Sequence, residues 1–341
     1  MHHVDTQKLI IRPIDIDSDD DLQNLIDLSS AVSIKLYGHP SHITVEEQRA
    51  NLKPTPYDEI YRWVAEYEGI LMGQVTAQLP LQDDSDFVYV SLLLHPEYEA
   101  GEVAQLLAHH AYTRAIVPSG RKHINYFANI MPYESLDDPS LAANRVAAVL
   151  GVSPKNDAVT RIAPLPLAPA LVEMVSSKVE ALSDLHLEVW ENHFPKEHLD
   201  SIARAFYQLE LDEPVGEAEK EPTQFTADQV AALEKRIHDS GERFLAAVVL
   251  DGSEVAAISL VEYSEHLTNI SAWQSSTVVM PDFRGRGVSR LLKFTLYSKL
   301  PELAPNLQQI ITMNSAVNPA MIKVNEELGY RPVWEEICYQ N

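Results

Sequence analysis

The alternation of hydrophobic and polar positions is clearest in the C-terminal half of the chain, where it predicts a helix followed by strands. Thr226-Ala-Asp-Gln229 has the spacing of a capping box, and apolar residues follow it with helical periodicity. Apolar runs over 244–250 and 255–261, separated by a short Asp-Gly-Ser turn, predict a β-hairpin. The pattern further predicts strands over 277–279, 308–313 and 332–339, and helices over 287–299 and 319–328. This alternation of strands and helices indicates a mixed α/β fold.

Part of the pattern occurs twice along the chain. Residues 96–107 (PEYEAGEVAQLL) and 281–292 (PDFRGRGVSRLL) share a proline, an aromatic residue, a valine and a Leu-Leu pair. Residues 140–152 match 318–330 in the same order and at nearly the same offset. A duplicated unit on either side of a proline-rich linker therefore predicts two domains. Their expected ranges are 1–165 and 180–341.

Composition and charge narrow the choice of partners. The 341 residues include 26 basic and 50 acidic side chains, a net charge of −24. That field repels phosphate backbones and anionic lipids, so nucleic acid and membrane surfaces are poor partners. A cationic ligand suits the charge, although acidity for solubility alone is the more common explanation of such a charge. The single cysteine, Cys338, rules out a disulfide scaffold and a thiolate zinc site. We expect no metal, and without an apolar signal segment we expect a cytoplasmic protein.

The sharpest chemical signal is the turn over 279–290, where a predicted strand ends and a helix begins. Gly285 and Gly287 allow the backbone to approach a ligand closely. The first amides of the following helix and its dipole form an anion site suited to a pyrophosphate. The spacing fits neither the dinucleotide fingerprint of three glycines nor the P-loop. Three arginines add positive charge to the turn, Arg284, Arg286 and Arg290.

This turn resembles the acetyl-CoA pyrophosphate motif of the GNAT acetyltransferases, Arg/Gln-x-x-Gly-x-Gly/Ala. Residues 318–330, with an initial asparagine and a Leu-Gly-aromatic ending, resemble the next conserved block of that family. The combination is similar to bacterial tandem GNAT proteins of the mycothiol synthase type. Ser289 stands where the family usually has glycine or alanine, and serine is small enough to keep the approach open. The resemblance implies two tandem GNAT folds in the α/β (α+β) class, each with a mixed, mostly antiparallel central sheet flanked by helices.

The resemblance also implies acetyl-CoA as co-substrate and assigns residues to it. A splayed strand would hydrogen-bond the pantetheine arm, the turn would cradle the pyrophosphate, and an asparagine would bind the arm from the other side. These residues are Thr277, Val278, Val279, Arg284, Gly285, Arg286, Gly287, Val288, Ser289, Arg290 and Asn318.

The first copy of the turn differs in charge. Glu99 stands where the second copy has Arg284, and Glu102 where it has Gly287. Like charges at 4 Å cost on the order of 1–4 kcal/mol each, depending on the dielectric. We therefore expect the first domain to have lost acetyl-CoA binding and to serve as a structural unit, with binding of another ligand as the alternative.

The catalytic residues are less well defined. The resemblance implies direct attack of an amine on the acetyl thioester in a ternary complex, with a backbone N–H, for which Val279 is the candidate, stabilising the oxyanion. Many members of the family place a tyrosine general acid seven residues after the asparagine, where this chain has Asn325, and a glutamate base where it has Met313. We expect Asn325 to hydrogen-bond the reacting group and Glu262 to act as base. Glu265 and His266 are the other candidates for the base, and Asp212 and Glu213 are candidates to anchor the ammonium of the acceptor. Tyr339 and the carboxylate of Asn341 stay open as further groups that could reach a site.

Together these features favour an acetyltransferase whose C-terminal domain moves an acetyl group from acetyl-CoA to the amine of a small molecule. One alternative is a non-catalytic acyl-CoA-binding or sensor protein, and another is a scaffold that binds no acetyl-CoA. The acidic stretch over 210–222 is either a solvated loop or a lip over a site that receives a cationic amine. The sequence leaves the acceptor and the oligomeric state open.

Overall fold

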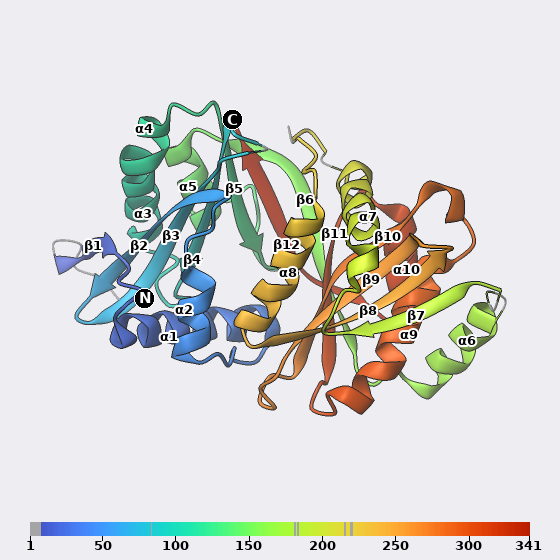
Figure 1. Ribbon diagram of the computed structural model, residues 1–341. Helices are drawn as coiled ribbons and strands as arrows, with labels where there is room; N and C mark the ends of the chain where they lie inside the picture. Colours follow the sequence, from blue (N-terminus) through green and yellow to red (C-terminus); the bar gives the residue numbers. More distant parts are fainter. Residues whose placement is uncertain (1–7, 83, 181, 183, 215, 219–220) are drawn as a thin grey trace. The chain divides into compact units, whose positions relative to one another are not determined.

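The computed structural model describes residues 8–341 except residues 83, 181, 183, 215 and 219–220 (Figure 1). The chain forms two compact units, and each unit combines separate chain segments. The first comprises residues up to Ala158, a short segment ending at Glu221, and Val333–Asn341; the second comprises Val159–Pro214 and Pro222–Pro332.

The first unit is built on a sheet with the strand order β1-β2-β3-β4-β5-β12. Its neighbouring strands pair antiparallel, except β4 and β5, which pair parallel. The strands are β1 (Ile10–Pro13), β2 (Asp58–Tyr67), β3 (Ile70–Pro80), β4 (Phe87–Leu94), β5 (His123–Ile130) and β12 (Arg331–Gln340). The helices are α1 (Asp19–Tyr37), α2 (Val45–Leu52), α3 (Val103–Ala111), α4 (Val117–Ser119) and α5 (Ala142–Leu150), with a π-helical turn at Tyr112–Ile116.

The second unit repeats this plan with the strand order β6-β11-β10-β9-β8-β7. Strands β7 to β10 pair antiparallel, and β10 pairs parallel with β11. The strands are β6 (Ser153–Pro164), which enters the unit at Val159, β7 (His186–Glu191), β8 (Glu242–Asp251), β9 (Glu254–Ser264), β10 (Ser271–Val279) and β11 (Gln309–Ser315). The helices are α6 (Pro169–Glu180), α7 (Leu199–Asp212), α8 (Ala227–Asp239), α9 (Val288–Leu303) and α10 (Pro319–Glu327), with 3₁₀ turns at Lys196–His198 and Pro281–Phe283.

The sheet of the second unit is buried on both faces. All seven residues of 244–250 in β8 are buried, and they alternate between two apolar clusters. Residues of α9 and α10 pack in one cluster and residues of α7 and α8 in the other, so the two pairs of helices cover opposite faces (Figure 1). A strand that is covered on both faces needs apolar residues at every position, and residues 244–250 are all apolar.

The structure confirms the predicted fold class and the elements expected in the C-terminal half. The capping box predicted at Thr226 is present, with its hydroxyl accepting from Gln229 N and the Gln229 side chain bonding back. The hairpin, the two helices and the later strands occur where the pattern placed them. The last of these, β12, pairs with β5 from Asn125 to Ile130 and so completes the sheet of the first unit.

Three features differ from the sequence expectations. The stretch expected to be a linker between 165 and 180 contains α6. The compact units are not the contiguous ranges 1–165 and 180–341, because the last strand of the chain joins the first unit. The acidic stretch begins as helix, since α7 continues to Asp212. The hydrophobic pattern of a strand does not show which sheet the strand joins, so periodicity alone could not predict that β12 pairs in the first unit.

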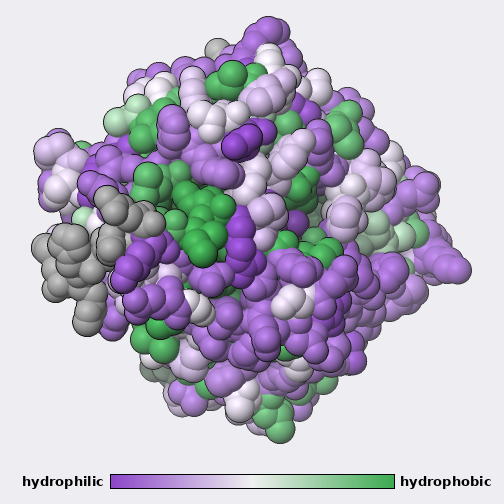
Figure 2. All heavy atoms as spheres, turned by 90° about the vertical axis from the view of Figure 1, so that its left-hand side faces the viewer, coloured by the Kyte–Doolittle hydropathy of each residue, from purple (hydrophilic) through white to green (hydrophobic). Residues whose placement is uncertain are grey.

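Polar residues cover most of the face in Figure 2, and hydrophobic residues gather there in a few patches between them. Through the described residues, no helix combines the length and the apolar character needed to cross a bilayer.

Candidate functional site

The site begins where two parallel strands of the second unit separate. β10 and β11 pair only from Ser271 to Trp273, opposite Gln309 to Ile311. Beyond that point β10 stays paired with β9 as far as Val279. Its other edge has no strand partner there among the described residues. The two strands therefore form a V that leaves backbone groups of β10 available to a ligand.

A β-bulge marks the point of separation. The register between β10 and β9 shifts between Gln274 and Ser276, and the side chain of Gln274 holds this irregularity in place. Its Nε2 donates to Leu260 O at 2.7 Å and to Ser276 O at 2.8 Å, and its Oε1 accepts from Tyr297 at 2.9 Å. Bulges re-aim strands next to functional sites, and this one directs β10 away from β11.

After the bulge, alternate residues of β10 direct their backbone groups into the V. Met280 N donates to Ala256 O of β9 at 2.9 Å. Because successive peptide groups of a strand point to opposite edges, the N–H and C=O of Val279 and Thr277 face the other way, toward the V. The bond from Arg284 Nε to Val279 O, at 2.9 Å, agrees with this direction.

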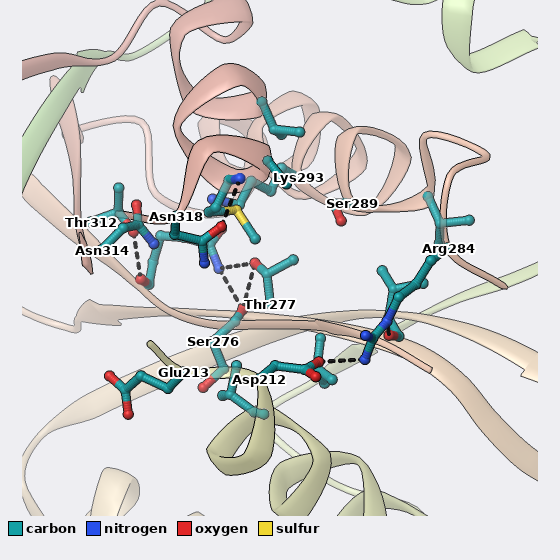
Figure 3. A pocket seen from close by; sticks show the side chains of 18 of the residues that line it. Asp212, Glu213, Ser276, Thr277, Arg284, Ser289, Lys293, Thr312, Asn314 and Asn318 are labelled. Carbon is teal, nitrogen blue, oxygen red and sulfur yellow. Dashed lines mark hydrogen bonds and ion pairs between the residues drawn. The ribbon is translucent and has the colours of Figure 1, made fainter. Parts of the chain in front are cut away.

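A pocket of about 740 Å³ fills the V and continues to the start of α9. Figure 3 shows Arg284 and Ser289 toward one end, Thr312 and Asn314 toward the other, and Thr277 between them. Asp212 and Glu213, at the end of α7, line the opposite wall. All the lining residues belong to the second unit.

The predicted turn lies at one end of the pocket. Gly285 and Gly287 have φ values of +76° and +87°, which glycine adopts without strain. A Cβ at Gly287 would also lie 3.0 Å from a nitrogen of Arg290. The first helical bonds of α9 run from Arg290 N and Leu291 N to Gly287 O, so the amides of Val288 and Ser289 precede the hydrogen-bond ladder. Such amides at a helix start suit a diphosphate.

The three arginines of the turn each pair with a carboxylate. Arg284 lines the pocket and pairs with Asp212. The other two lie outside the lining residues: Arg286 Nη2 is 2.9 Å from Asp184, and Arg290 Nε is 2.6 Å from Glu327. Of the arginine side chains that the sequence assigned to the pyrophosphate, only Arg284 is therefore at the wall of the pocket.

The remaining cofactor candidates come together. Thr277, Val278, Val279, Val288, Ser289 and Asn318 all line the same pocket as the two glycines. Asn318 caps α10, because its Oδ1 accepts from Met321 N at 3.2 Å (Figure 3).

The catalytic candidates do not come together. Asn325 is fully buried behind the pocket wall, and Glu262 lies on β9 opposite Trp273, outside the lining residues. Of the alternatives, only Asp212 and Glu213 line the pocket. Glu265 pairs with Arg243, while Tyr339 and Asn341 belong to the first unit.

Lys293 is a pocket residue that sequence reasoning missed. It lies on α9, is 1% exposed, and its Nζ donates to Asn325 Oδ1 at 2.7 Å. Burial lowers the pKa of this amine to about 7. The available signal was its spacing, since Lys293 stands four residues after Ser289 and three before Leu296, on the face of the helix that turns inward.

The corresponding turn of the first unit is organised differently. The carboxylate of Glu99 accepts from Lys35 Nζ at 2.8 Å, and its carbonyl accepts from Arg145 at 2.6 Å. β4 keeps an unbroken register with β3 from Tyr89 to Leu94, and it pairs with β5 as far as Ser91. The described residues of this strand therefore have no bulge comparable with that of β10.

Comparisons with known proteins agree on the fold. No protein-family model and no curated protein sequence matches the chain. Among solved structures, a tandem GNAT protein from the clavulanic acid biosynthesis pathway is 20% identical, with 98% of each chain covered and a TM-score of 0.73. A GCN5-related N-acetyltransferase from Sphaerobacter thermophilus is 13% identical, with 98% of this chain and 95% of that chain covered and a TM-score of 0.61. The N-myristoyltransferase of Saccharomyces cerevisiae, solved with bound myristoyl-CoA, is 14% identical, with 100% of this chain and 79% of that chain covered and a TM-score of 0.57.

These likenesses place the chain in the tandem GNAT fold, with two GNAT units in one polypeptide. Within the described residues, no group of three or more histidine, cysteine, aspartate or glutamate side chains is arranged to hold a metal ion.

Proposed function

We propose that the second unit is an acetyltransferase that moves an acetyl group from acetyl-CoA to the amine of a small molecule. The observation that carries this proposal is the combination of two features in one pocket. The separated strand β10 offers backbone groups to a pantetheine arm, and the turn at Gly285–Gly287 offers helix amides to the diphosphate. Two solved structures with the same fold are acetyltransferases of the GNAT family, from Sphaerobacter thermophilus and Colwellia psychrerythraea, which supports the same class of reaction.

The residues divide between the two substrates. Val288 and Ser289 N–H groups, with Arg284, would bind the diphosphate, and Asn318 together with the Thr277–Val279 strand would hold the arm. The N–H groups of Thr277 and Val279 face the pocket, so either can donate to an oxyanion at the acetyl carbonyl. An amine acceptor would enter beside Glu213, whose carboxylate favours a cationic ligand, because Asp212 is already paired with Arg284.

Thermal unfolding with acetyl-CoA tests the binding half of the proposal. A ligand at about 100 times its Kd adds ~2.7 kcal/mol to the free energy of unfolding, which gives a clear rise in Tm. We expect Arg284→Glu to abolish this rise, because a carboxylate would face the diphosphate in place of a guanidinium. Glu99→Ala, at the matching position of the first unit, is the control and should leave the rise unchanged. An undiminished rise in Arg284→Glu would contradict the assignment.

Release of free thiol from acetyl-CoA in the presence of a panel of amines tests the transfer half. Acetyl transfer predicts a rate above that of the buffer for at least one amine. Binding of acetyl-CoA without thiol release from any amine would instead favour a non-catalytic acyl-CoA-binding or sensor protein. This alternative is motivated by Asn325 and Met313, neither of which can transfer a proton at neutral pH.

A further inference from the structure

The amine of Lys293 is buried at the wall of the pocket. Lys293 is among the largest fully buried side chains of the protein, yet it lines the pocket. Its Nζ donates to Asn325 Oδ1 at 2.7 Å and lies 5.7 Å from the centre of the Tyr330 ring. Among the described residues no carboxylate forms a salt bridge with it. A lysine in such a place is expensive to keep charged, and proteins that retain one often use it chemically.

The surroundings of Lys293 are polar but uncharged. Asn325 donates in turn to Asn314 Oδ1 of β11. The titratable groups facing the amine are the phenols of Tyr330, from the segment after α10, and Tyr297, one turn further along α9, which share a hydrogen bond of 2.6 Å. Burial raises the pKa of both phenols far above neutrality, so both stay neutral. The protonation state of the pocket wall near pH 7 therefore depends on Lys293, whose pKa burial brings to about 7.

Lys293 lies beyond Ser289 on α9, on the side of the pocket toward Asn318 (Figure 3). It is six residues beyond Gly287, about 9 Å along the helix. Its partners lead to the apex of the V: Tyr330 contacts Tyr297, and Tyr297 donates to Gln274, where β10 and β11 separate. Five residues of strand separate Val279 from Gln274, a length of about 16 Å. A pantetheine arm that extends along β10 from a diphosphate at the turn would therefore bring its thioester close to Gln274.

We propose that Lys293 is a catalytic residue that carries the proton from the acceptor nitrogen to the sulfur of coenzyme A, an inference that rests on the proposed function. In this step the nitrogen of the acceptor forms a bond to the acetyl carbon, and the carbon–sulfur bond breaks with its electron pair on sulfur. The neutral Nζ takes the proton that the nitrogen must lose and gives it to the sulfur. Nitrogen and sulfur are bonded to the same carbon during the reaction, so one amine can reach both. The lysine ends neutral and the coenzyme leaves as a free thiol.

The bond to Asn325 fits this role. An amide oxygen can only accept, so Asn325 Oδ1 fixes one N–H of the lysine and leaves the lone pair of the neutral amine for the proton in transit. Because Asn325 is itself held by Asn314, the direction of the lysine is set by a network of amides that cannot titrate. The pair thus supplies the proton transfer that Asn325 alone cannot.

The ionisation of bound coenzyme A tests the proposal without knowledge of the acceptor. The thiolate absorbs in the ultraviolet, and desulfo-coenzyme A provides the blank. If Lys293 adjoins the sulfur, its ammonium stabilises the thiolate. We expect about tenfold more thiolate at pH 7 in the wild-type complex than in the Lys293→Met complex, a change equivalent to one pH unit in the thiol pKa. Lys293→Gln keeps an amide that can donate to Asn325 but cannot carry a proton, and it should lose the thiolate as well.

Lys299→Met is the matched control, since Lys299 lies on the same helix, pairs with Glu191 and does not line the pocket. It should keep the wild-type thiolate. Equal thiolate in wild type and both Lys293 variants, with coenzyme A still bound, would overturn the role of Lys293 while leaving the proposed function intact. Restoration of the thiolate by Lys293→Gln would also overturn it, because the lysine would then act only through position. Failure of the wild type to bind coenzyme A would overturn both proposals.

Discussion

At the scale of single residues, the proposed chemistry depends on Lys293, a fully buried amine at the wall of the pocket. Its place in the structure is supported by Asn325, a partner 32 residues away in sequence. The proposed pair also gives a role to Asn325, which stands where the GNAT resemblance predicts a tyrosine acid, because its amide would orient the amine of Lys293.

The burial of Lys293 should make the free energy of unfolding of the protein depend on pH. Lys293 has a pKa of about 7 in the folded chain and an ordinary value near 10.4 in the unfolded chain. Between these pH values the unfolded chain binds a proton that the folded chain does not. Lys293 therefore makes the wild-type free energy of unfolding increase as pH rises through this window. Lys293→Met removes the effect. We expect its free energy of unfolding, relative to wild type, to rise by about 1.4 kcal/mol for each pH unit from about 10 down to 7, and to level off below.

Denaturant unfolding at several pH values measures this difference. Lys299→Met, at a half-buried position of the same helix where the amine pairs with Glu191, should show no such slope. A flat difference between Lys293→Met and wild type across the window would mean that the amine keeps its ordinary pKa in the folded chain.

The sequence predicted part of the site at this scale. The glycines, Arg284, Ser289 and Asn318 belong to contiguous motifs, so their presence in one pocket could be predicted from local sequence. Lys293 could not, because its environment is made by α10 and β11 as well as by its own helix. The same limit explains Arg286 and Arg290, whose distant carboxylate partners hold them outside the pocket lining.

At the scale of elements, the bulge in β10 is what opens the pocket. Its stability depends on the side chain of Gln274, which supplies donors to two backbone carbonyls that regular pairing would have satisfied. The sequence predicted the strand, the turn and the helix that follow, because each has its own periodicity and end signals. It did not predict the bulge, since that feature arises between Gln274, Leu260 and Tyr297 on three different elements.

Replacement of the glutamine should therefore close or distort the V. In Gln274→Leu the carbonyls of Leu260 and Ser276 each lose one donor and keep only hydroxyl donors, at a cost of about 1–3 kcal/mol in the free energy of unfolding. We also expect weaker binding of acetyl-CoA, measured by calorimetry. Gln308→Leu, an exposed position beside β11, should change neither quantity. Unchanged stability in Gln274→Leu would show that the bulge does not depend on this side chain.

At the scale of the whole molecule, the chain contains two units with the same plan and different turns. The internal repeat predicted the duplication, and the structure has the same order of elements in each half. The boundaries could not be predicted, because the final strand of the second repeat belongs to the sheet of the first unit and only long-range pairing reveals this.

We predict that one chain binds one molecule of acetyl-CoA. Glu99→Arg combined with Glu102→Gly gives the first turn the charges of the second, yet it should not create a second site, since β4 lacks the bulge and stays in register with β3. Titration calorimetry should return a stoichiometry of one for both the wild type and this double variant. A stoichiometry of two in the double variant would mean that turn charge alone decides binding.

A crystal structure with acetyl-CoA tests the central claim most directly. We predict that the diphosphate lies on the amides of Val288 and Ser289, that the arm follows β10, and that the sulfur lies within hydrogen-bond reach of Lys293 Nζ. Coenzyme bound beside Glu99 and Glu102, with the pocket of the second unit empty, would contradict the account.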